Sequence, residues 1–541
     1  MKTRKSVPIQ LTDNAHERNS QRRLAFGLLV VVLLALALRT VHYAANPSMW
    51  YDELAIARNV ADRNISGLIF EPLDHLQVAP IGFLFVTKLS TILFGVNEFA
   101  LRVMPWTFAL MAPVVFWLIA RRFINGMLLL SALLLFAVSP ALTWYGGNVK
   151  QYSSDITISM ILVWLALEYL ERSVGTRWAV IAGLVGALLI PCSQPGVVTA
   201  FVLCAILAIE HLRRANGKPF LSLAVLAGGW GIGALIATVF ALRLVGARTM
   251  EHMKDFWSQG FPPTDSIAAC LAWYPAQISA TFGVFLFHIA SNMPPFAQIA
   301  VVLAVLAIPG CVYLLRQDRW ATALLLAPPI GALTMATLHV LPFRHRVGLH
   351  AVWPILVLAM GFFRALHGRF PRAARWLVPA ALVVFAGFPS AALLALGRPP
   401  YRGHQEMRPL LQDFAGRREP GDAVYVFHGA RHAMHFYGAS FGINADEWTE
   451  GGVHYGDNRA YLREIDAFRG RPRVWFVYTQ MLRFKAPRDI VAYLNEIGVQ
   501  LDVLVDPYGQ KGQSESAAYL FDLSDHQRLM RDTAESFSLR E

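Results

Sequence analysis

Residues 24–45 have the sequence LAFGLLVVVLLALALRTVHYAA and directly follow two arginines, Arg22 and Arg23. About twenty consecutive apolar residues are needed for a helix to cross the hydrocarbon core of a bilayer. The apolar region of a secretory signal peptide is shorter, about 7–15 residues. The stretch therefore predicts a transmembrane helix that is retained in the protein, preceded by a cytoplasmic segment over residues 1–23.

The composition of the whole chain is that of a membrane protein. Of its 541 residues, 55% are hydrophobic and 16% are charged, whereas soluble domains have about 25% charged residues. The net charge of +12 would suggest nucleic acid or another anionic partner in a soluble protein. In a membrane protein the cytoplasmic loops account for such an excess, so we expect membrane lipid as a partner and no nucleic acid.

Eleven stretches are long and apolar enough to be spans. They lie near residues 24–43, 101–120, 127–145, 156–171, 178–191, 196–211, 220–243, 297–315, 320–341, 348–364 and 376–396. Alternate connections are basic, with Arg22 and Arg23; Arg121 and Arg122; Arg172 and Arg177; Arg213, Arg214 and Lys218; Arg316 and Arg319; and Arg364, Arg369, Arg372 and Arg375. Because Lys and Arg favour the cytoplasmic side, this pattern predicts a multi-pass protein of the plasma (bacterial inner) membrane.

Two further apolar stretches do not fit the charge pattern as spans. Residues 80–95 are too few and include Lys88, and residues 266–290 include Pro275 and polar positions. We expect both to lie along the outer membrane face or dip into it. The predicted transmembrane domain covers residues 24–397, and the segment 398–541 then lies outside, in the periplasm or extracellular space.

Residues 398–541 have shorter apolar runs and more charge. Short strands are predicted at 423–427, 474–478, 501–505 and 517–521, and amphipathic helices at 404–418 and 486–498. This alternation predicts a small α/β domain. The overall fold class is mainly α, a polytopic helical membrane domain with juxtamembrane helices and a C-terminal α/β domain.

The four cysteines, Cys192, Cys204, Cys270 and Cys311, form no C-x-x-C pair and lie in apolar surroundings. This pattern predicts buried free thiols rather than a zinc or redox site.

Acidic and basic side chains gather in the predicted outer loops. Asp52 and Glu53 follow the first span, in a loop that also holds His75, and Lys150 and Asp155 precede the span at 156–171. Acids at helix starts are also ordinary, since they favour the helix dipole or cap the first turn. Aromatic-flanked acids in both loops are not explained by independent capping, and they predict a shared polar site.

Arginines on the same predicted face suit an anionic substrate. Arg344 and Arg346 lie between two spans, against the positive-inside trend, and Arg102 lies near the outer end of the second span. Guanidinium groups match phosphate oxygens, although snorkelling toward lipid headgroups is the simpler alternative. The loop 246–265 could line the same site.

Carboxylates that take a proton and arginines that hold a phosphate suit one reaction. A carboxylate deprotonates an acceptor hydroxyl, the acceptor attacks the anomeric carbon of a lipid-linked sugar, and cationic groups stabilise the leaving phosphate. A single displacement of this kind inverts the anomeric centre.

The chain resembles the C-type membrane glycosyltransferases, in the family-39-like branch that holds protein O-mannosyltransferases and lipid A aminoarabinose transferases. The matching residues are Trp50-Tyr51-Asp52-Glu53, Ala79-Pro80, residues 95–102 (GVNEFALR), Trp144-Tyr145-Gly146 and Asp155. The resemblance covers residues 20–180 well and 320–365 more loosely.

The resemblance implies that Asp52 is the catalytic base or acceptor-binding acid, with Glu53 in support and Asp155 completing the site. It also implies that later outer arginines, here Arg344 and Arg346, bind the carrier phosphate. The partners would be a polyprenyl-phosphate-sugar donor and a lipid, glycan or protein acceptor.

Two departures leave the donor and acceptor open. Gln77 stands where the aminoarabinose transferases have a phosphate-contacting lysine, so phosphate contact at this place is open. Residues 150–155 (KQYSSD) stand where the commoner pattern is Arg-x-Arg-Pro-Asp, and there Lys150 is the candidate to supply the missing charge. Some relatives use a divalent cation, for which Asp52, Asp155 and His75 are the possible ligands; we expect no obligatory metal.

Two other functions are compatible with a polytopic protein. A transporter or lipid flippase of cell-envelope precursors would have ionisable residues within spans and broken helices, and Pro191, Pro195, Pro328 and Pro329 are the candidate breaks. An inactive assembly or sensor protein could retain the fold. The acids and arginines at outer span ends favour surface chemistry.

Overall fold

The computed structural model describes residues 13–171, 175–214, 220–292, 295–372, 387, 405–480, 486–506 and 516–525. The chain divides into two compact units. Met1–Ala44 and Asn64–Pro400 form the first, here called the helical unit, and Ala45–Arg63 and Tyr401–Glu541 form the second, the α/β unit. The division at 400/401 lies close to the predicted one at 397/398, but the segment 45–63 packs with the C-terminal residues.

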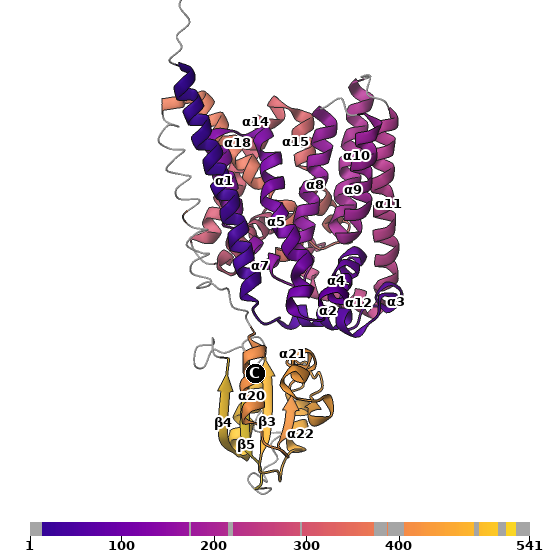
Figure 1. Ribbon diagram of the computed structural model, residues 1–541, viewed down its shortest axis with the longest axis vertical. Coiled ribbons are helices and arrows are strands. Elements are labelled where there is room, and N and C mark those ends of the chain that lie inside the picture. The colour runs from indigo at the N-terminus through magenta and orange to yellow at the C-terminus, as the bar shows by residue number, and fades with distance from the viewer. Residues whose placement is uncertain are drawn as a thin grey trace, which may run out of the picture. The chain divides into compact units, whose positions relative to one another are not determined.

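The helical unit contains the membrane-spanning helices. Within the described residues, seven helices are long and apolar enough to cross a bilayer. They are α1 (Asp13–Ala45), α5 (Glu98–Phe123), α8 (Tyr152–Glu171), α10 (Gln194–Arg214), α11 (Phe220–Leu244), α13 (Ile267–Phe287) and α14 (Phe296–Gln317). Figure 1 shows α1, α5, α8, α10 and α11 running lengthwise through this unit. The chain is therefore a multi-span membrane protein.

Three further spans are bent helix pairs, which raises the number of candidates to ten in the described part of the chain. The pairs are α6 (Gly126–Ala137) with α7 (Pro140–Gly146), α15 (Arg319–Leu325) with α16 (Ala327–Thr337), and η4–α17 (His345–Val352) with α18 (Pro354–Arg369), bent by 48°, 52° and 45°. Each second helix has a proline in its first two positions. Proline cannot donate to the preceding turn, so the helix breaks there.

The spans differ from the sequence prediction at three places. The predicted exclusion of 266–290 is not supported, because α13 is continuous across Pro275 and passes as a candidate span. The predicted span at 178–191 corresponds to α9 (Thr176–Leu189) and η1 (Ile190–Cys192), which together are shorter than a full span. The predicted span at 376–396 lies outside the described residues, except for residue 387.

Shorter elements gather at the end of the helical unit where α1 ends. They are α3 (Ile65–Phe70), α4 (Ile81–Phe94) and α12 (Ala247–Phe256) (Figure 1). With 14 residues, α4 is too short to cross a bilayer, which agrees with the predicted juxtamembrane helix. The remaining short helices of the unit are η2 (Ser258–Gly260) and η3 (His288–Asn292).

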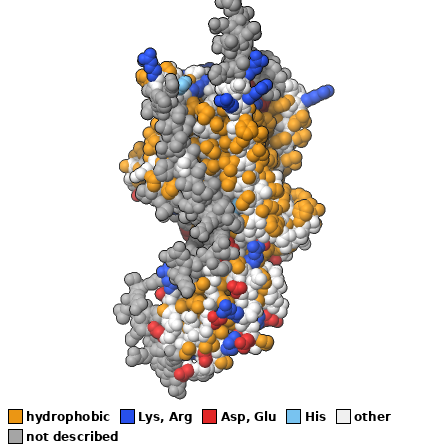
Figure 2. All heavy atoms as spheres, turned by 60° about the vertical axis from the view of Figure 1, so that its left-hand side comes forward, with side chains coloured by type: hydrophobic (Ala, Val, Ile, Leu, Met, Phe, Trp, Pro, Cys, Tyr) orange, Lys and Arg blue, Asp and Glu red, His pale blue; other side chains and the backbone are white. Residues whose placement is uncertain are grey.

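The outside of the helical unit is apolar. Leu188, Phe201, Leu212 and Leu242 each expose about three quarters of their surface, and Figure 2 shows hydrophobic side chains over the helices and Lys and Arg side chains at the end where α1 begins. A soluble protein rarely exposes so much contiguous apolar surface. The helices thus face lipid.

A buried arginine stabilises the break between α6 and α7. The Arg39 guanidinium, on α1, donates to the carbonyls of Ala35 (2.9 Å), Ala137 (3.2 Å) and Phe136 (3.4 Å). The last two carbonyls belong to the end of α6, where the helix can no longer satisfy them. Arg39 therefore replaces hydrogen bonds that the break removes.

The α/β unit is built on a five-stranded sheet of order β2-β1-β3-β5-β4. Its strands are β1 (Ala423–Val426), β2 (Thr449–Glu450), β3 (Val474–Thr479), β4 (Val499–Val505) and β5 (Ser516–Asp522), and its helices are α2 (Tyr51–Asp62), α20 (Met407–Arg417), α21 (Arg431–Tyr437), α22 (Asn458–Asp466) and α23 (Ala486–Ile497). Strands β2, β1 and β3 are parallel, whereas β5 pairs antiparallel with β3 and β4. The four predicted strands and two predicted helices are confirmed.

The core of the α/β unit explains why β1 and β3 are apolar throughout. Helices α22 and α23 cover one face through Tyr461, Ile465 and Ile490. On the other face Phe414 of α20 meets the Trp475 ring edge-on at 5.3 Å. Strands that are covered on both faces have continuous rather than alternating apolar sequences.

Candidate active site

The first candidate acids lie in the first turn of α2. Asp52 is half-buried, whereas Glu53 is 1% exposed. The Glu53 carboxylate accepts a hydrogen bond from the Trp50 amide at 3.4 Å, so Glu53 helps to cap the start of α2. Glu53 is therefore not a solvent-exposed acid at a helix start. Asp52 is the more accessible acid, and Glu53 supports the turn that carries it.

Asp155 lies in the first turn of α8 and is 7% exposed. Its Oδ1 accepts a hydrogen bond from the Ser193 hydroxyl at 2.6 Å. The same hydroxyl accepts the Gly196 amide at 3.1 Å, at the start of α10. A buried carboxylate needs such a donor, because leaving it unpaired away from water is costly. Ser193 thus links Asp155 to the next span.

Lys150 precedes α8 and is 6% exposed. Its ammonium group donates to the side-chain oxygen of Gln77 at 2.9 Å. The Gln77 amide in turn donates to the His75 carbonyl at 3.2 Å, in a turn where His75 and Leu76 both have positive φ. The loop between α3 and α4, which carries the half-buried His75, therefore meets Lys150 at the start of α8.

Arg346, in η4, reaches the same helix start. Its Nε donates to the Tyr152 hydroxyl at 3.0 Å, and its guanidinium lies 5.3 Å from the centroid of the Trp257 ring. The Tyr152 ring packs edge-on against Tyr145 at 5.0 Å. Because residues three apart on a helix share a face, Tyr152 and Asp155 lie on one side of α8. These contacts place the Arg346 guanidinium beside the helix start that carries Asp155.

Arg344 and Arg102 occupy different surroundings. Arg344 is half-buried before η4, next to Phe343, whose amide donates to the Gly260 carbonyl at 2.8 Å. Arg102 lies in the second turn of α5 and is 0% exposed. Such burial favours a supporting role for Arg102 over direct contact with a substrate.

Three residues of the helical unit were not among the sequence candidates: Arg39, His42 and Ser193. Arg39 and His42 are fully buried on α1, and the His42 ring lies 5.4 Å from that of Trp144. Ionisable residues inside an apolar span mark functional or structural sites. That signal could have identified both, whereas Ser193 carries none.

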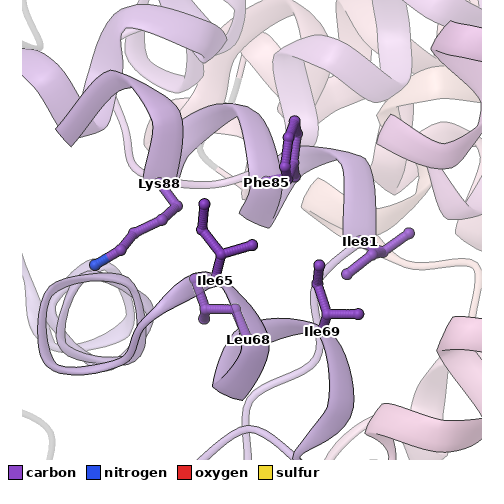
Figure 3. A pocket seen from close by; sticks show the side chains of 6 residues that line it. All are labelled: Ile65, Leu68, Ile69, Ile81, Phe85 and Lys88. Atoms are coloured by element: carbon purple, nitrogen blue, oxygen red, sulfur yellow. The ribbon is translucent and has the colours of Figure 1, made fainter. Parts of the chain in front are cut away.

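A small apolar hollow between α3 and α4 is separate from these polar groups. It has an empty volume of about 170 Å³ and is lined by Ile65, Leu68, Ile69, Ile81, Phe85 and Lys88 (Figure 3). Ligand pockets are usually about 300–1,000 Å³. The hollow is too small for a sugar, and we assign it no substrate.

Comparisons with known proteins bear on this arrangement. Residues 78–232 match the model of the family described as dolichyl-phosphate-mannose-protein mannosyltransferase. This stretch includes Arg102, Lys150 and Asp155. Comparison with curated protein sequences gives no significant match.

Solved structures match most of the chain, and one of them reaches a TM-score above 0.5. ArnT from Cupriavidus metallidurans in the apo state matches with a TM-score of 0.51 and 12% identity, over 94% of this chain and 99% of that one. The same enzyme bound to undecaprenyl phosphate gives a TM-score of 0.49 and 12% identity, over 91% and 97%. The Archaeoglobus fulgidus oligosaccharyltransferase in complex with Zn and sulfate gives 0.46 and 13%, over 92% and 73%.

Residues 78–232 are thus similar to a glycosyltransferase family, and the chain shares the fold of the membrane enzyme ArnT. The resemblance found in the sequence is thus confirmed. Bent spans alone would also suit a transporter, but the family match favours the enzyme.

Proposed function

We propose that this glycosyltransferase moves a sugar from a polyprenyl-phosphate-linked donor to a hydroxyl group of an acceptor on the extracytoplasmic face. The observation that carries the proposal is Arg346, which Tyr152 and Trp257 hold beside the start of α8. Lys150 lies at the same helix start. Two cations at one end of an apolar helical unit suit a lipid that ends in a phosphate.

We assign roles in the reaction to six of the eight candidate residues, and Glu53 and Arg102 support the helices that carry them. Arg346, with Arg344 and Lys150 in support, binds the carrier phosphate, and His75 belongs to the same substrate-binding group. Asp52 is the catalytic base. Asp155, fixed by Ser193, orients a substrate hydroxyl, because a carboxylate accepts strong hydrogen bonds from such groups.

The reaction is a single displacement. Asp52 takes the proton of the acceptor hydroxyl while the oxygen of that hydroxyl attacks the anomeric carbon of the donor sugar. The bond from that carbon to the phosphate oxygen breaks, and the electron pair leaves with the polyprenyl phosphate, whose charge Arg346 and Lys150 stabilise. Attack opposite the leaving phosphate inverts the anomeric configuration. We propose no obligatory metal.

The charge pattern supports a location in the bacterial inner membrane, with the N-terminus in the cytoplasm. The contacts between the segment 45–63 and the C-terminal residues support an outer position for the α/β unit, since the segment 45–63 would follow the outer end of α1. A reporter phosphatase fused after Ser524 should be active only outside the cytoplasm. An inactive fusion in a stable protein would reverse the proposed orientation.

The test of the function uses purified protein in liposomes with a panel of hexosyl and pentosyl undecaprenyl phosphates and an envelope extract as acceptor. Release of undecaprenyl phosphate is followed by mass spectrometry. The wild type should consume at least one donor, and Asp52→Asn should lower turnover at least ~100-fold, as expected for a lost general base. Asp62→Asn, at the exposed far end of α2, is the matched control. Normal turnover by Asp52→Asn would remove Asp52 from the mechanism.

A further inference from the structure

The segment that carries Asp52 is held by side chains from the C-terminal part of the chain. The Ser48 amide donates to Glu406 Oε2 at 3.1 Å, and the Met49 amide donates to the Tyr437 hydroxyl at 2.9 Å. The Tyr51 amide donates to Gln405 Oε1 at 3.0 Å. Three main-chain groups within four residues of Asp52 are therefore fixed by the α/β unit.

A second set of contacts supports the first. Arg408 donates from its guanidinium to the Asn46 carbonyl at 2.7 Å and from its amide to the Ser48 hydroxyl at 3.2 Å. The Glu406 amide donates to Asp506 Oδ2 at 3.4 Å. Ser48 and Met49 are buried. Glu406 is thus itself anchored, and the segment that leads into α2 is held at Asn46 and Ser48 as well.

Helix α2 also packs on α21 along its length. The Tyr51 ring lies 4.8 Å from the His432 ring, and Arg58, two turns later, approaches His432 Nδ1 at 3.1 Å. Leu54 and Ala57 are buried between these positions. The contacts bracket Asp52 and fix the rotation of the helix about its axis.

The residue at the helix start explains why remote groups are needed. The first amides of a helix are usually capped by a Ser, Thr, Asp or Asn side chain at the N-cap position. Here the N-cap is Trp50, whose indole has only a donor. The Gln405 oxygen accepts the Tyr51 amide instead, so the C-terminal part of the chain supplies one partner of the α2 start and Glu53 another.

We propose that Gln405 and Tyr437 are positioning residues that hold Asp52 in its reactive orientation, so that the C-terminal part of the chain takes part in catalysis through α2. This inference rests on the proposed function of Asp52. A displacement of a reacting group by about 1 Å can cost ~100-fold in rate. Loss of one of these two anchors, Gln405 or Tyr437, should therefore lower the turnover rate more than it weakens binding of the donor.

Tyr437→Phe is the test, because it removes only the hydroxyl. In the liposome assay, with the donor that the wild type consumes, kcat should fall about tenfold and KM for the donor should change less than twofold. Tyr493→Phe is the matched control, since it removes a buried hydroxyl that bonds Asp466 at 2.6 Å elsewhere in the same unit. Its kcat should stay within twofold of the wild type.

Hydrogen exchange of the intact protein gives a second readout that needs no substrate. The amides of residues 48–58 should exchange at least tenfold faster in Tyr437→Phe and Gln405→Met than in Tyr493→Phe. If Tyr437→Phe does not fold, Gln405→Met carries both measurements. Wild-type kcat and wild-type protection of these amides in the folded anchor variants would overturn the proposal.

The outcomes separate the two ideas. If Asp52→Asn is inactive and the anchor variants behave like the wild type, the positioning role fails and the proposed function stands. If Asp52→Asn is active, the proposed function of Asp52 fails whatever the anchors do.

Discussion

The Ser193 hydroxyl donates to the Asp155 carboxylate at 2.6 Å while it accepts the Gly196 amide. One side chain therefore both orients a candidate site acid and caps the helix that follows. The two roles predict different effects for different substitutions.

Ser193→Ala should lower turnover about tenfold, because a hydrogen bond to a charged group contributes ~1.5–3 kcal/mol. It should also destabilise the start of α10 by ~1 kcal/mol through the lost cap. Ser193→Thr retains the hydroxyl and should stay close to the wild type. Kinetics and thermal unfolding of the three proteins in detergent check this, and full activity in Ser193→Ala would show that the contact is dispensable.

Arg346 should act mainly on donor binding. Arg346→Lys retains the charge but loses the planar fork that pairs with phosphate, so KM for the donor should rise about tenfold with a smaller change in kcat. Tyr152→Phe removes one contact of the guanidinium and should raise KM about threefold. Arg369→Lys, at the end of α18, is the control. An Arg346→Lys protein with unchanged KM would contradict phosphate binding by this residue.

Arg39 should matter for stability. Arg39→Met leaves the Phe136 and Ala137 carbonyls without this donor, and a buried acceptor left unsatisfied costs ~1–3 kcal/mol. The apparent melting temperature in detergent should fall by several degrees. Arg22→Met, an exposed change on the same helix, should have no effect. Equal melting temperatures would show that the break between α6 and α7 needs no such support.

His428 should make the α/β unit sensitive to acid. Burial, followed by the nearby Arg431 charge, lowers the pKa of His428 to about 4, against about 6.5 when unfolded. Between these values the unfolded chain binds more protons, so stability falls as pH falls from about 6.5 to 4. At ~1.4 kcal/mol per pKa unit, the loss is a few kcal/mol at most.

Exchange of the β1 and β3 amides in the intact protein, corrected for intrinsic rates, measures this effect. Protection should drop between pH 7 and 5 in the wild type and change less in His428→Phe. The same drop in both proteins would assign the acid sensitivity to another group.

The sequence predicted the fold where the physical signal is local. Apolar length and alternating arginines identify most spans, and apolar runs identify β1, β3, β4 and β5. The two-residue β2 has too little pattern to be found. Pro275 led to the exclusion of α13, and this was wrong because a single proline is tolerated inside a long apolar helix.

The candidate residues were predictable as a set but not as a geometry. Loop acids and arginines stand out by charge, and the contacts of Lys150 with Gln77 and of Arg346 with Tyr152 follow from how distant spans pack. The grouping of Asp52 with the C-terminal residues likewise depends on packing between distant parts of the chain. Its anchors, Gln405 and Tyr437, carry no motif, because a hydrogen bond to a main-chain amide requires no particular sequence around the acceptor.

The grouping of α2 with the C-terminal residues has a consequence for biosynthesis. Ser48 and its partner Glu406 are separated by 358 positions, and ribosomes add roughly 5–20 residues per second. The helix that bears Asp52 thus waits on the order of 20–70 s for its supports to be translated. A nascent or truncated chain would carry this acid unsecured in its first loop, so the enzyme matures only when its last domain is complete.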